Sequence, residues 1–337
     1  MNISLYEDSD FKIFSEYINK FFKPNYILGY KEYINWQYEN SLYILKIENR
    51  VAGHFGFRDI PYKIGHNVEN VRVLMNLFVV PGLRTMGAGA FLAKKVFDTP
   101  TPILVSGYTP ISQKLFSYLS KSWKEAGNFC RFIKILNPGN NFLKKYNIPH
   151  VVPEYSRGKK YLKIKKQKNV IMLERAWLEA KERYTVTVER NQDYLKWRFL
   201  ENPSIDYSVF TCFKDDSPCG FIIGRIESDQ GFTMARIIDF ITVEEAEIPL
   251  IENFVRWAYE SDCDAVDFLF SGKFYEKSLK ESGFFDVTDT DFVNFPVLFS
   301  PISNKKTFIN IAHNLDFPLD QCYFNKADGD QDRPNPH

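Results

Sequence analysis

The sequence has no excess of charge of either sign. Its 337 residues include 43 lysines and arginines against 42 aspartates and glutamates, for a formal net charge of +1. Proteins that bind nucleic acid usually present a basic surface to the phosphate backbone. We therefore expect no nucleic-acid partner.

Cysteine pairs and long apolar runs are also lacking. The five cysteines, at positions 130, 212, 219, 263 and 322, form no CxxC pair. Neither a disulfide framework nor a zinc site is indicated, and we expect no metal. No apolar run approaches the length needed to cross a bilayer. The opening MNISLYEDSD has neither the basic flank nor the apolar stretch of a signal peptide. These absences predict a cytoplasmic protein without membrane insertion.

A repeat is present, with a period of about 160 residues. Similar stretches begin at Tyr33 and Tyr194, and each precedes a hairpin pattern, LYILKI…VAGHFGF in one copy and YSVFTCF…CGFIIGR in the other. The turns fall at 48–50 and 215–218. A longer strand, a helix, another strand and a final helix follow in both copies. In the second copy a stripe at Ile251, Phe254, Val255 and Ala258 has the spacing of an amphipathic helix. The order β-β-β-α-β-α, twice, predicts two α/β domains.

We place the domain boundaries from these repeats and from composition. The first domain takes residues 1–150 and the second 181–300, joined by a connecting segment at 151–180. That segment includes 157–168, in which seven of twelve residues are basic. Residues 301–337 form an extension whose end, ADGDQDRPNPH, has the composition of a disordered tail.

A glycine-containing loop links the strand at 71–80 to the next helix. It reads VVPGLRTMGAGA (79–90), with two glycines where the helix begins. Residues without a Cβ let the backbone approach a ligand, and the first N–H groups of a helix attract anions. A plain tight turn would also explain a lone GxG.

The extended pattern is more specific than GxG. It resembles the acyl-CoA loop of the GNAT acyltransferase superfamily, Arg/Gln-x-x-Gly-x-Gly/Ala after a Val-x-Pro strand end, and the elements here are Val79, Pro81, Arg84, Gly87 and Gly89. The chain is also similar to the tandem GNAT proteins of bacterial surface-polysaccharide pathways, in which a stretch like DYLKWRFLENP (193–203) opens the second half. The resemblance covers roughly residues 30–125 and 185–290. It implies a mostly antiparallel central sheet flanked by helices in each domain.

The resemblance also implies roles for individual residues. The cofactor is acetyl-CoA or another acyl-CoA, with its pyrophosphate on the backbone of the loop and its pantetheine arm beside the strand near Val79. The N–H of Leu77 would polarise the thioester carbonyl, a contact worth about 3 kcal/mol. The loop residues concerned are Arg84, Thr85, Met86, Gly87, Ala88, Gly89 and Ala90.

The family's general acid is a tyrosine on the last helix, and Tyr118 matches it, with Ser122 where a glycine is usual. Tyr118 would protonate the leaving thiolate; packing on a helix face is the alternative. His54 is a candidate base because histidine titrates near neutrality, although a lone strand histidine is commonly structural. Asn76 cannot act as a base but can orient water or the substrate.

The second copy departs from the loop pattern. Where the first copy has glycines, the second reads VEEAEIP (243–249), with three carboxylates that would repel a pyrophosphate. The residue matching Tyr118 is Leu279. We therefore expect one CoA per chain, bound in the first domain.

The predicted activity is N-acyl transfer, acetyl in the first instance, from acyl-CoA to the amine of a small acceptor by direct attack in a ternary complex. A nucleotide-linked amino sugar is suggested by the resemblance alone. Two alternatives stay open: a FemABX-like aminoacyltransferase that uses aminoacyl-tRNA, and a non-catalytic CoA-binding protein. The oligomeric state is open too, a homodimer included.

Overall fold

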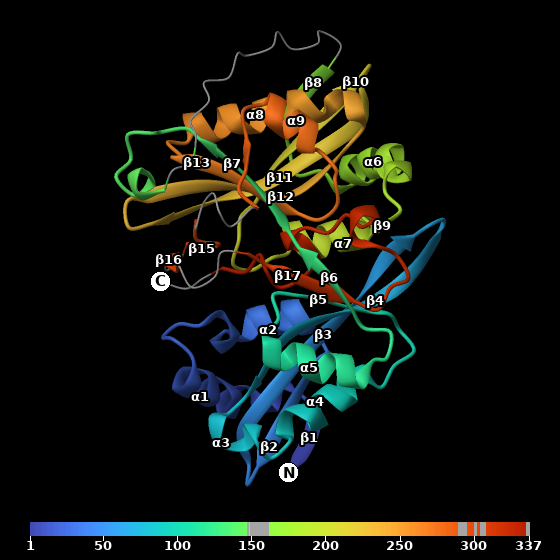
Figure 1. Ribbon diagram of the computed structural model, residues 1–337, viewed down its shortest axis with the longest axis vertical. Coiled ribbons are helices and arrows are strands. Elements are labelled where there is room, and N and C mark those ends of the chain that lie inside the picture. Colours follow the sequence, from blue (N-terminus) through green and yellow to red (C-terminus); the bar gives the residue numbers. More distant parts are fainter. Residues whose placement is uncertain (147, 149–161, 289–294, 300–301, 304–307, 335–337) are drawn as a thin grey trace.

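The computed structural model describes residues 1–146, 148, 162–288, 295–299, 302–303 and 308–334. Two mixed sheets, each flanked by helices, form two lobes along the long axis (Figure 1). The prediction of an α/β protein with two mixed sheets is confirmed. Among the described residues, no helix is both long and apolar enough to span a lipid bilayer.

The first sheet has the order β1-β2-β3-β4-β5-β17-β6, with β9 added beside β3. Its strands are β1 (Asn2–Leu5), β2 (Leu42–Ile47), β3 (Arg50–Ile64), β4 (Asn67–Val79), β5 (Ile103–Ser106), β6 (Lys124–Asn128), β9 (Val186–Val188) and β17 (Asn310–His313).

The second sheet has the order β14-β7-β13-β12-β11-β10-β8. Its strands are β7 (Cys130–Ile135), β8 (Leu162–Lys166), β10 (Ser208–Lys214), β11 (Ser217–Asp229), β12 (Phe232–Thr242), β13 (Ala265–Phe270) and β14 (Phe285–Asp286); β15 (Leu298–Phe299) and β16 (Ile302–Ser303) pair separately.

The α-helices are α1 (Phe11–Phe21), α2 (Lys31–Tyr38), α3 (Pro81–Arg84), α4 (Ala88–Phe97), α5 (Pro110–Leu119), α6 (Val170–Ala180), α7 (Gln192–Leu195), α8 (Glu247–Glu260) and α9 (Glu276–Glu281). Shorter or irregular turns are η1 (Asp8–Asp10), η2 (Ile27–Gly29), η3 (Leu143–Lys145), η4 (Lys181–Arg183), η5 (Lys196–Leu200), η6 (Glu244–Ala246), η7 (Leu319–Gln321) and η8 (Lys326–Asp328).

The two sheets have the same strand order, and in each order one strand comes from the other half of the chain; the first sheet also has β9, from the second half, beside β3. In the first sheet the position between β5 and β6 is taken by β17, near the C-terminus; in the second, the position between β13 and β14 is taken by β7. The pairings around both inserted strands are antiparallel. In Figure 1 the green strands β6 and β7 run from one lobe to the other, and the red β17 lies beside β5 and β6. The halves are therefore interlocked through reciprocal strand exchange.

The expected hairpin turns are confirmed. Glu48 and Asn49, between β2 and β3, have φ values of 48° and 59°, and Asp215 and Asp216, between β10 and β11, have 48° and 64°. Two left-handed residues in succession give the turn whose twist suits a tight antiparallel hairpin. The amphipathic helix predicted in the second repeat is also confirmed. Its apolar residues Ile251, Phe254, Val255 and Ala258 lie on α8 and are all buried.

Two segments differ from the sequence-based expectation. Residues 162–180, expected to connect the domains, form β8 and α6 of the second lobe. The first five residues of the basic stretch, 157–161, lie outside the described part of the chain. The tail at 327–337 was expected to be disordered, but Asp328, Asp330 and Asp332 in its described part, 327–334, are almost fully buried. Buried carboxylates lose their hydration, and here buried basic side chains pair with them in place of water.

The lobes share one hydrophobic core. Side chains of α1 and α2 cover one face of the first sheet, in a cluster that continues through α6 to the second sheet. Helices α4 and α5 cover the opposite face of the first sheet in a separate cluster. Where the repeats meet, Trp36 and Trp197 stack, and each indole Nε1 donates to the other's carbonyl oxygen at 2.8 Å. This contact matches the repeat openings that the sequence indicated.

Candidate functional site

Strands β4 and β5 separate part of the way along their length. They pair in parallel only from Arg72 to Leu74, against Ile103 to Val105. Beyond this point Asn76 has a φ of 54°, and the pairing of β4 with β3 shifts register between His54 and Gly56. A bulge of this kind bends a strand and leaves backbone groups out of the ladder. The bulge thus opens the sheet between β4 and β5.

A cavity of about 170 Å³ lies at this opening. Asn76 and Leu77 of β4 line it, together with hydroxyl-bearing residues after β5 and a short stretch of the C-terminal segment. The lining residues are Phe55, Leu74, Met75, Asn76, Leu77, Val105, Ser106, Gly107, Tyr108, Thr109, Ser112, Phe116, Asp330, Gln331 and Arg333. Burial raises the pKa of Tyr108 to about 12, so its hydroxyl stays protonated near neutral pH.

A polar network holds the bulge. The Asn76 side-chain amide donates to the Tyr38 hydroxyl at 2.7 Å, and its oxygen accepts from Arg333. Arg333 also contacts Asp330 at 3.3 Å. Because Tyr38 and Arg333 occupy both ends of the Asn76 amide, that side chain has one defined orientation. Asn76 therefore lines the cavity with its side chain fixed.

The glycine loop has the expected strand–turn–helix form. Gly87 directly precedes α4 with a φ of 77°, a conformation that strains any other residue. A Cβ on Gly89 would meet only Val79 Cγ2 at 3.9 Å, an ordinary contact, so the fold itself does not require glycine there. The free N–H groups that begin a helix remain available to an anion. Arg84 points back to the strand end, where Nε donates to the Val79 carbonyl oxygen at 2.9 Å.

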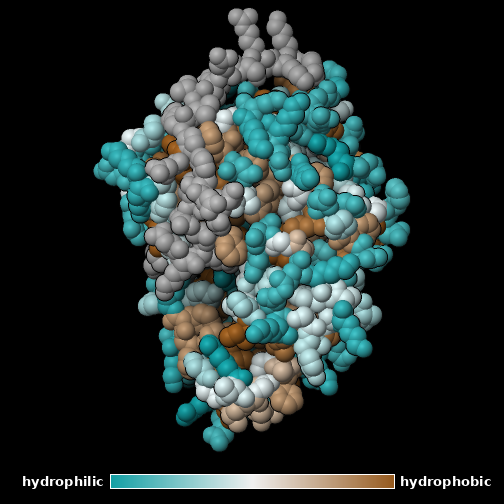
Figure 2. All heavy atoms as spheres, in the orientation of Figure 1, coloured by the Kyte–Doolittle hydropathy of each residue, from teal (hydrophilic) through white to brown (hydrophobic). Residues whose placement is uncertain are grey.

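A groove of about 660 Å³ leads from this loop between α4 and α5. It is lined by Gly87, Ala90, Phe91, Lys94, Phe97, Asp98, Tyr118 and Leu119. Phe91 and Tyr118 are strongly exposed. Figure 2 shows apolar surface among polar residues on the lobe that carries these helices. The groove thus combines an anion-attracting loop, apolar walls and the cation of Lys94.

Tyr118 and Asn76 do not line the same hollow. Tyr118 lies in the α4–α5 groove with 85% of its surface exposed, whereas Asn76 lines the cavity at the β4–β5 opening. The tyrosine that lines the cavity is Tyr108, at the other end of α5.

His54 lies on the opposite face of the sheet from the helices α4 and α5. Its neighbours Gly53 and Phe55 face α4 and α5, so the alternation of a strand directs His54 toward α1. There it is fully buried, with Nδ1 3.0 Å from the Tyr17 hydroxyl and Phe14, Phe22 and Phe78 around it. Burial lowers its pKa to about 3, so the ring is neutral at physiological pH. His54 does not line the cavity.

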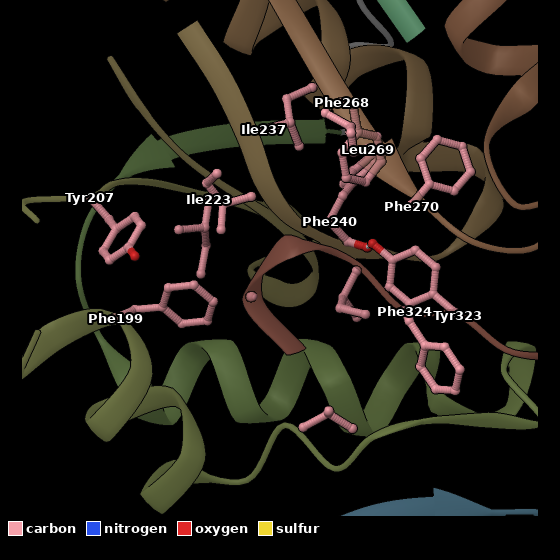
Figure 3. Close-up of a cluster of buried hydrophobic side chains, with 14 of the residues drawn as sticks. Phe199, Tyr207, Ile223, Ile237, Phe240, Phe268, Leu269, Phe270, Tyr323 and Phe324 are labelled. Atoms are coloured by element: carbon pink, nitrogen blue, oxygen red, sulfur yellow. The ribbon is translucent and has the colours of Figure 1, made fainter. Parts of the chain in front are cut away.

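In the second sheet the corresponding opening is filled by protein. Tyr323 and Tyr275 both donate to the Phe240 carbonyl oxygen, at 2.7 and 2.8 Å, and Asn325 bridges to Phe270 of β13. Figure 3 shows Tyr323 and Phe324 inserted beside Phe240 and Phe270. Asp239, at the end of this β12 region, is buried and paired with Arg190 at 3.0 Å.

The groove beside α8 and α9 is acidic. It is lined by Glu244, Glu245, Ile248, Lys277, Ser278 and Glu281. Three carboxylates against one lysine make it unsuited to an anionic cofactor. An open cavity with a glycine loop thus occurs in the first lobe, and a filled opening with an acidic groove in the second.

The sequence did not indicate Tyr108, Asp330, Gln331 or Arg333 as site residues. The last three belong to the segment that its composition marked as disordered. A usable signal was nevertheless present: Arg190, Arg198 and Arg225 stand in or beside predicted strands and helices, where a buried arginine needs a carboxylate partner. The alternating aspartates 328, 330 and 332 offered such partners. As for metals, the described residues contain no cluster of three histidine, cysteine or acidic groups able to hold one.

No protein-family model and no curated protein sequence matches the chain. Among solved structures it is similar to a GCN5-related N-acetyltransferase from Anabaena variabilis, with a TM-score of 0.57 and 14% identity over 93% of this chain and 71% of that one. A GCN5-related N-acetyltransferase from Kribbella flavida gives a TM-score of 0.56 at 12% identity, over 93% and 70% of the two chains. A probable N-acyltransferase from Enterococcus faecalis gives 0.59 at 9%, over 85% and 69%. These likenesses show that the chain has the fold of this group.

Proposed function

We propose that the chain is an acyltransferase that binds one acyl-CoA in its first lobe and transfers the acyl group to the amine of a small acceptor. The observation that carries this proposal is the difference between the lobes: the first has an open β4–β5 cavity and a glycine loop, and the described part of the second has neither. The fold shared with N-acetyltransferases supports the same reaction class.

The cofactor would run from the groove to the cavity. Its pyrophosphate would lie on the backbone from Arg84 to Ala90, as the N–H groups at the start of α4 favour. Its pantetheine arm would enter between β4 and β5, with the thioester near Leu77. We propose acetyl as the acyl group because the cavity is small, about 170 Å³.

For the leaving thiolate we propose Tyr108 as proton donor in place of Tyr118. Tyr108 lines the cavity, and because burial raises its pKa to about 12 the hydroxyl carries a proton at neutral pH that it can donate to the sulfur as the C–S bond breaks. Asn76 would orient the acceptor, since its amide is held by Tyr38. A nucleotide-linked amino sugar as acceptor, and the cytoplasm as compartment, rest on the sequence alone.

A matched pair of charge reversals tests this proposal. Lys94→Glu places a carboxylate in the α4–α5 groove, and Lys277→Glu places one in the α8–α9 groove of the other lobe. We expect calorimetry to give one acetyl-CoA per wild-type chain, with binding weakened about tenfold or more by Lys94→Glu through repulsion of the phosphates, and unchanged by Lys277→Glu. Wild-type chain that binds no acetyl-CoA would refute the proposed function. Two equivalents per chain would refute the assignment to the first lobe.

A further inference from the structure

The C-terminal segment passes through both openings in turn. After β17 it fills the second-sheet opening with Tyr323 and Asn325. It then crosses to the first-sheet cavity, which it lines with Asp330, Gln331 and Arg333. All the carboxylate and guanidinium groups that line this cavity, within the described part of the chain, therefore come from this segment.

The segment is fixed on both sides of Asp330. Upstream, Asp328 accepts hydrogen bonds from Arg190 at 3.3 Å and from the Tyr194 hydroxyl at 3.2 Å. Downstream, Asp332 accepts from Arg225 Nε and from the Tyr207 hydroxyl, both at 2.7 Å. These partners are nearly or fully buried. Two buried anchors two residues away on either side give the Asp330 backbone a defined position.

The Asp330 carboxylate is held at the edge of the cavity. One oxygen accepts from Gln331 Nε2 at 2.8 Å and the other lies 3.3 Å from Arg333 Nη1. Gln331 Nε2 also donates to the Ser106 carbonyl oxygen at the end of β5, at 3.0 Å. The segment approaches β5 so closely that a Cβ on Gly329 would lie 3.1 Å from Ser106 Oγ. The side chain of Asp330 is 7% exposed, so its charge faces the cavity and its partners more than bulk water.

Acyl transfer to an amine requires a proton acceptor at this place. When the amine nitrogen bonds to the thioester carbon, it becomes a cation and must lose a proton. A nitrogen attached to an electron-poor carbon is more acidic than a free ammonium, so a carboxylate is a sufficient base. His54 lies on the other face of the sheet, and Asn76 cannot accept the proton as a base.

We propose that Asp330 accepts this proton, an inference that rests on the proposed acyl transfer. The C–N bond forms, the C–S bond breaks, the ammonium proton passes to the Asp330 carboxylate, and CoA leaves as a thiolate that takes a proton from the Tyr108 hydroxyl. Solvent then takes the proton from Asp330 and returns one to Tyr108. Arg333 and Gln331 are positioning residues, because they act by holding the carboxylate. The structure thus assigns a catalytic residue to a segment that enters from the far end of the chain.

The experiment compares Asp330→Asn, Asp330→Ala and Asp330→Glu with the control Asp320→Asn, whose side chain is exposed in η7. Thiol release from acetyl-CoA is followed with hydroxylamine as a small nucleophile, and with water alone for the slow background reaction. We expect Asp330→Asn to lower the rate about 10²–10⁴-fold. The Kd for acetyl-CoA should stay at the wild-type value. Asp330→Glu should retain part of the rate, and added formate should partly restore Asp330→Ala.

The outcomes separate the two proposals. If wild-type protein binds acetyl-CoA and releases thiol while Asp330→Asn does so at the same rate, the assignment to Asp330 is wrong and the proposed function stands. Loss of activity together with loss of acetyl-CoA binding, without formate rescue, would also overturn it in favour of a structural role. Wild-type protein that does not bind acetyl-CoA would instead remove the proposed function itself.

Discussion

A histidine can be neutral because of its surroundings alone, and His54 illustrates this. Its ring packs among Phe14, Tyr17 and Phe78, and burial lowers its pKa to about 3. In the unfolded chain the same group titrates near pH 6.5. Below that pH the unfolded chain binds a proton at His54, whereas the folded chain leaves His54 neutral until the pH is near 3. Folding stability therefore falls as the pH falls.

This linkage can be measured through one variant. Between about pH 6 and pH 4, His54 should reduce the free energy of unfolding by about 1.4 kcal/mol per pH unit, and His313, whose pKa is lowered to about 4, acts in the same direction. We expect urea unfolding of His54→Gln to show a pH slope smaller by that amount than wild type. An unchanged slope would mean that His54 is protonated in the folded protein.

Residues whose role depends on local chain geometry were predictable, and residues whose role depends on distant partners were not. The turn at Gly87 was identified from its spacing after a strand, because the conformation of a tight turn is encoded locally. The direction of the His54 side chain depends on which sheet face each helix covers, which spacing does not encode. Asp330 and Arg333 join the cavity only because arginines of the second lobe hold Asp328 and Asp332 in place.

At the scale of one element, α5 carries a tyrosine near each end, and the two ends face different hollows. Tyr108 precedes the helix and lines the cavity; Tyr118 is its second-last residue and lies in the exposed groove. A proton donor must reach the sulfur of the thioester, and the cavity is where the proposed pantetheine arm ends. On the proposed mechanism, the tyrosine at one end of the helix would act in the chemistry and the one at the other end in binding.

Two single substitutions distinguish these roles. Tyr108→Phe removes the hydroxyl from the cavity, and we expect kcat for acetyl transfer to fall about 10²-fold or more, with little change in acetyl-CoA affinity. Tyr118→Phe keeps the ring in the groove and should leave kcat within about twofold of wild type. Steady-state kinetics with thiol detection decide between them. The reverse pattern would restore Tyr118 as the acid suggested by the family resemblance.

Elements that depend on periodicity or turn chemistry were predictable, and strand partners were not. The hairpins at 48–50 and 215–218 have turn residues, and α8 has its apolar stripe, so the order β-β-β-α-β-α could be read twice. Strands β7 and β17 are only six and four residues long, and their sequences do not indicate which of the two sheets each strand joins. The prediction that the acidic tail is disordered was wrong for a related reason. Composition gives the charges of a segment but does not show which distant side chains pair with them.

At the scale of the whole molecule, the strand exchange makes the two halves depend on each other. A fragment of residues 1–146 lacks β17 and would leave a gap between β5 and β6. A fragment of residues 162–337 lacks β7 and would leave a gap between β13 and β14. Open strand edges and exposed core surface do not give a stable fold.

We therefore expect neither fragment to fold alone, and the two expressed together to form a one-to-one complex that binds acetyl-CoA. Size-exclusion chromatography and thermal unfolding monitored by circular dichroism provide the measurement. Full-length chain cleaved at a protease site introduced between 149 and 161 is the control, and it should remain associated. A fragment 1–146 that unfolds cooperatively by itself would contradict this dependence.

The strand exchange also determines how long the first sheet stays incomplete while the chain is being translated. Strand β17 is translated about two hundred residues after β5, beside which it must pair. At about 5–20 residues per second the first sheet waits roughly 10–40 s for its missing strand, and Asp330 emerges later still. A ribosome that stops early therefore releases a chain with its glycine loop but without a finished sheet or cavity. On the proposed mechanism, activity would belong only to chains translated beyond β17 and the cavity-lining residues 330–333.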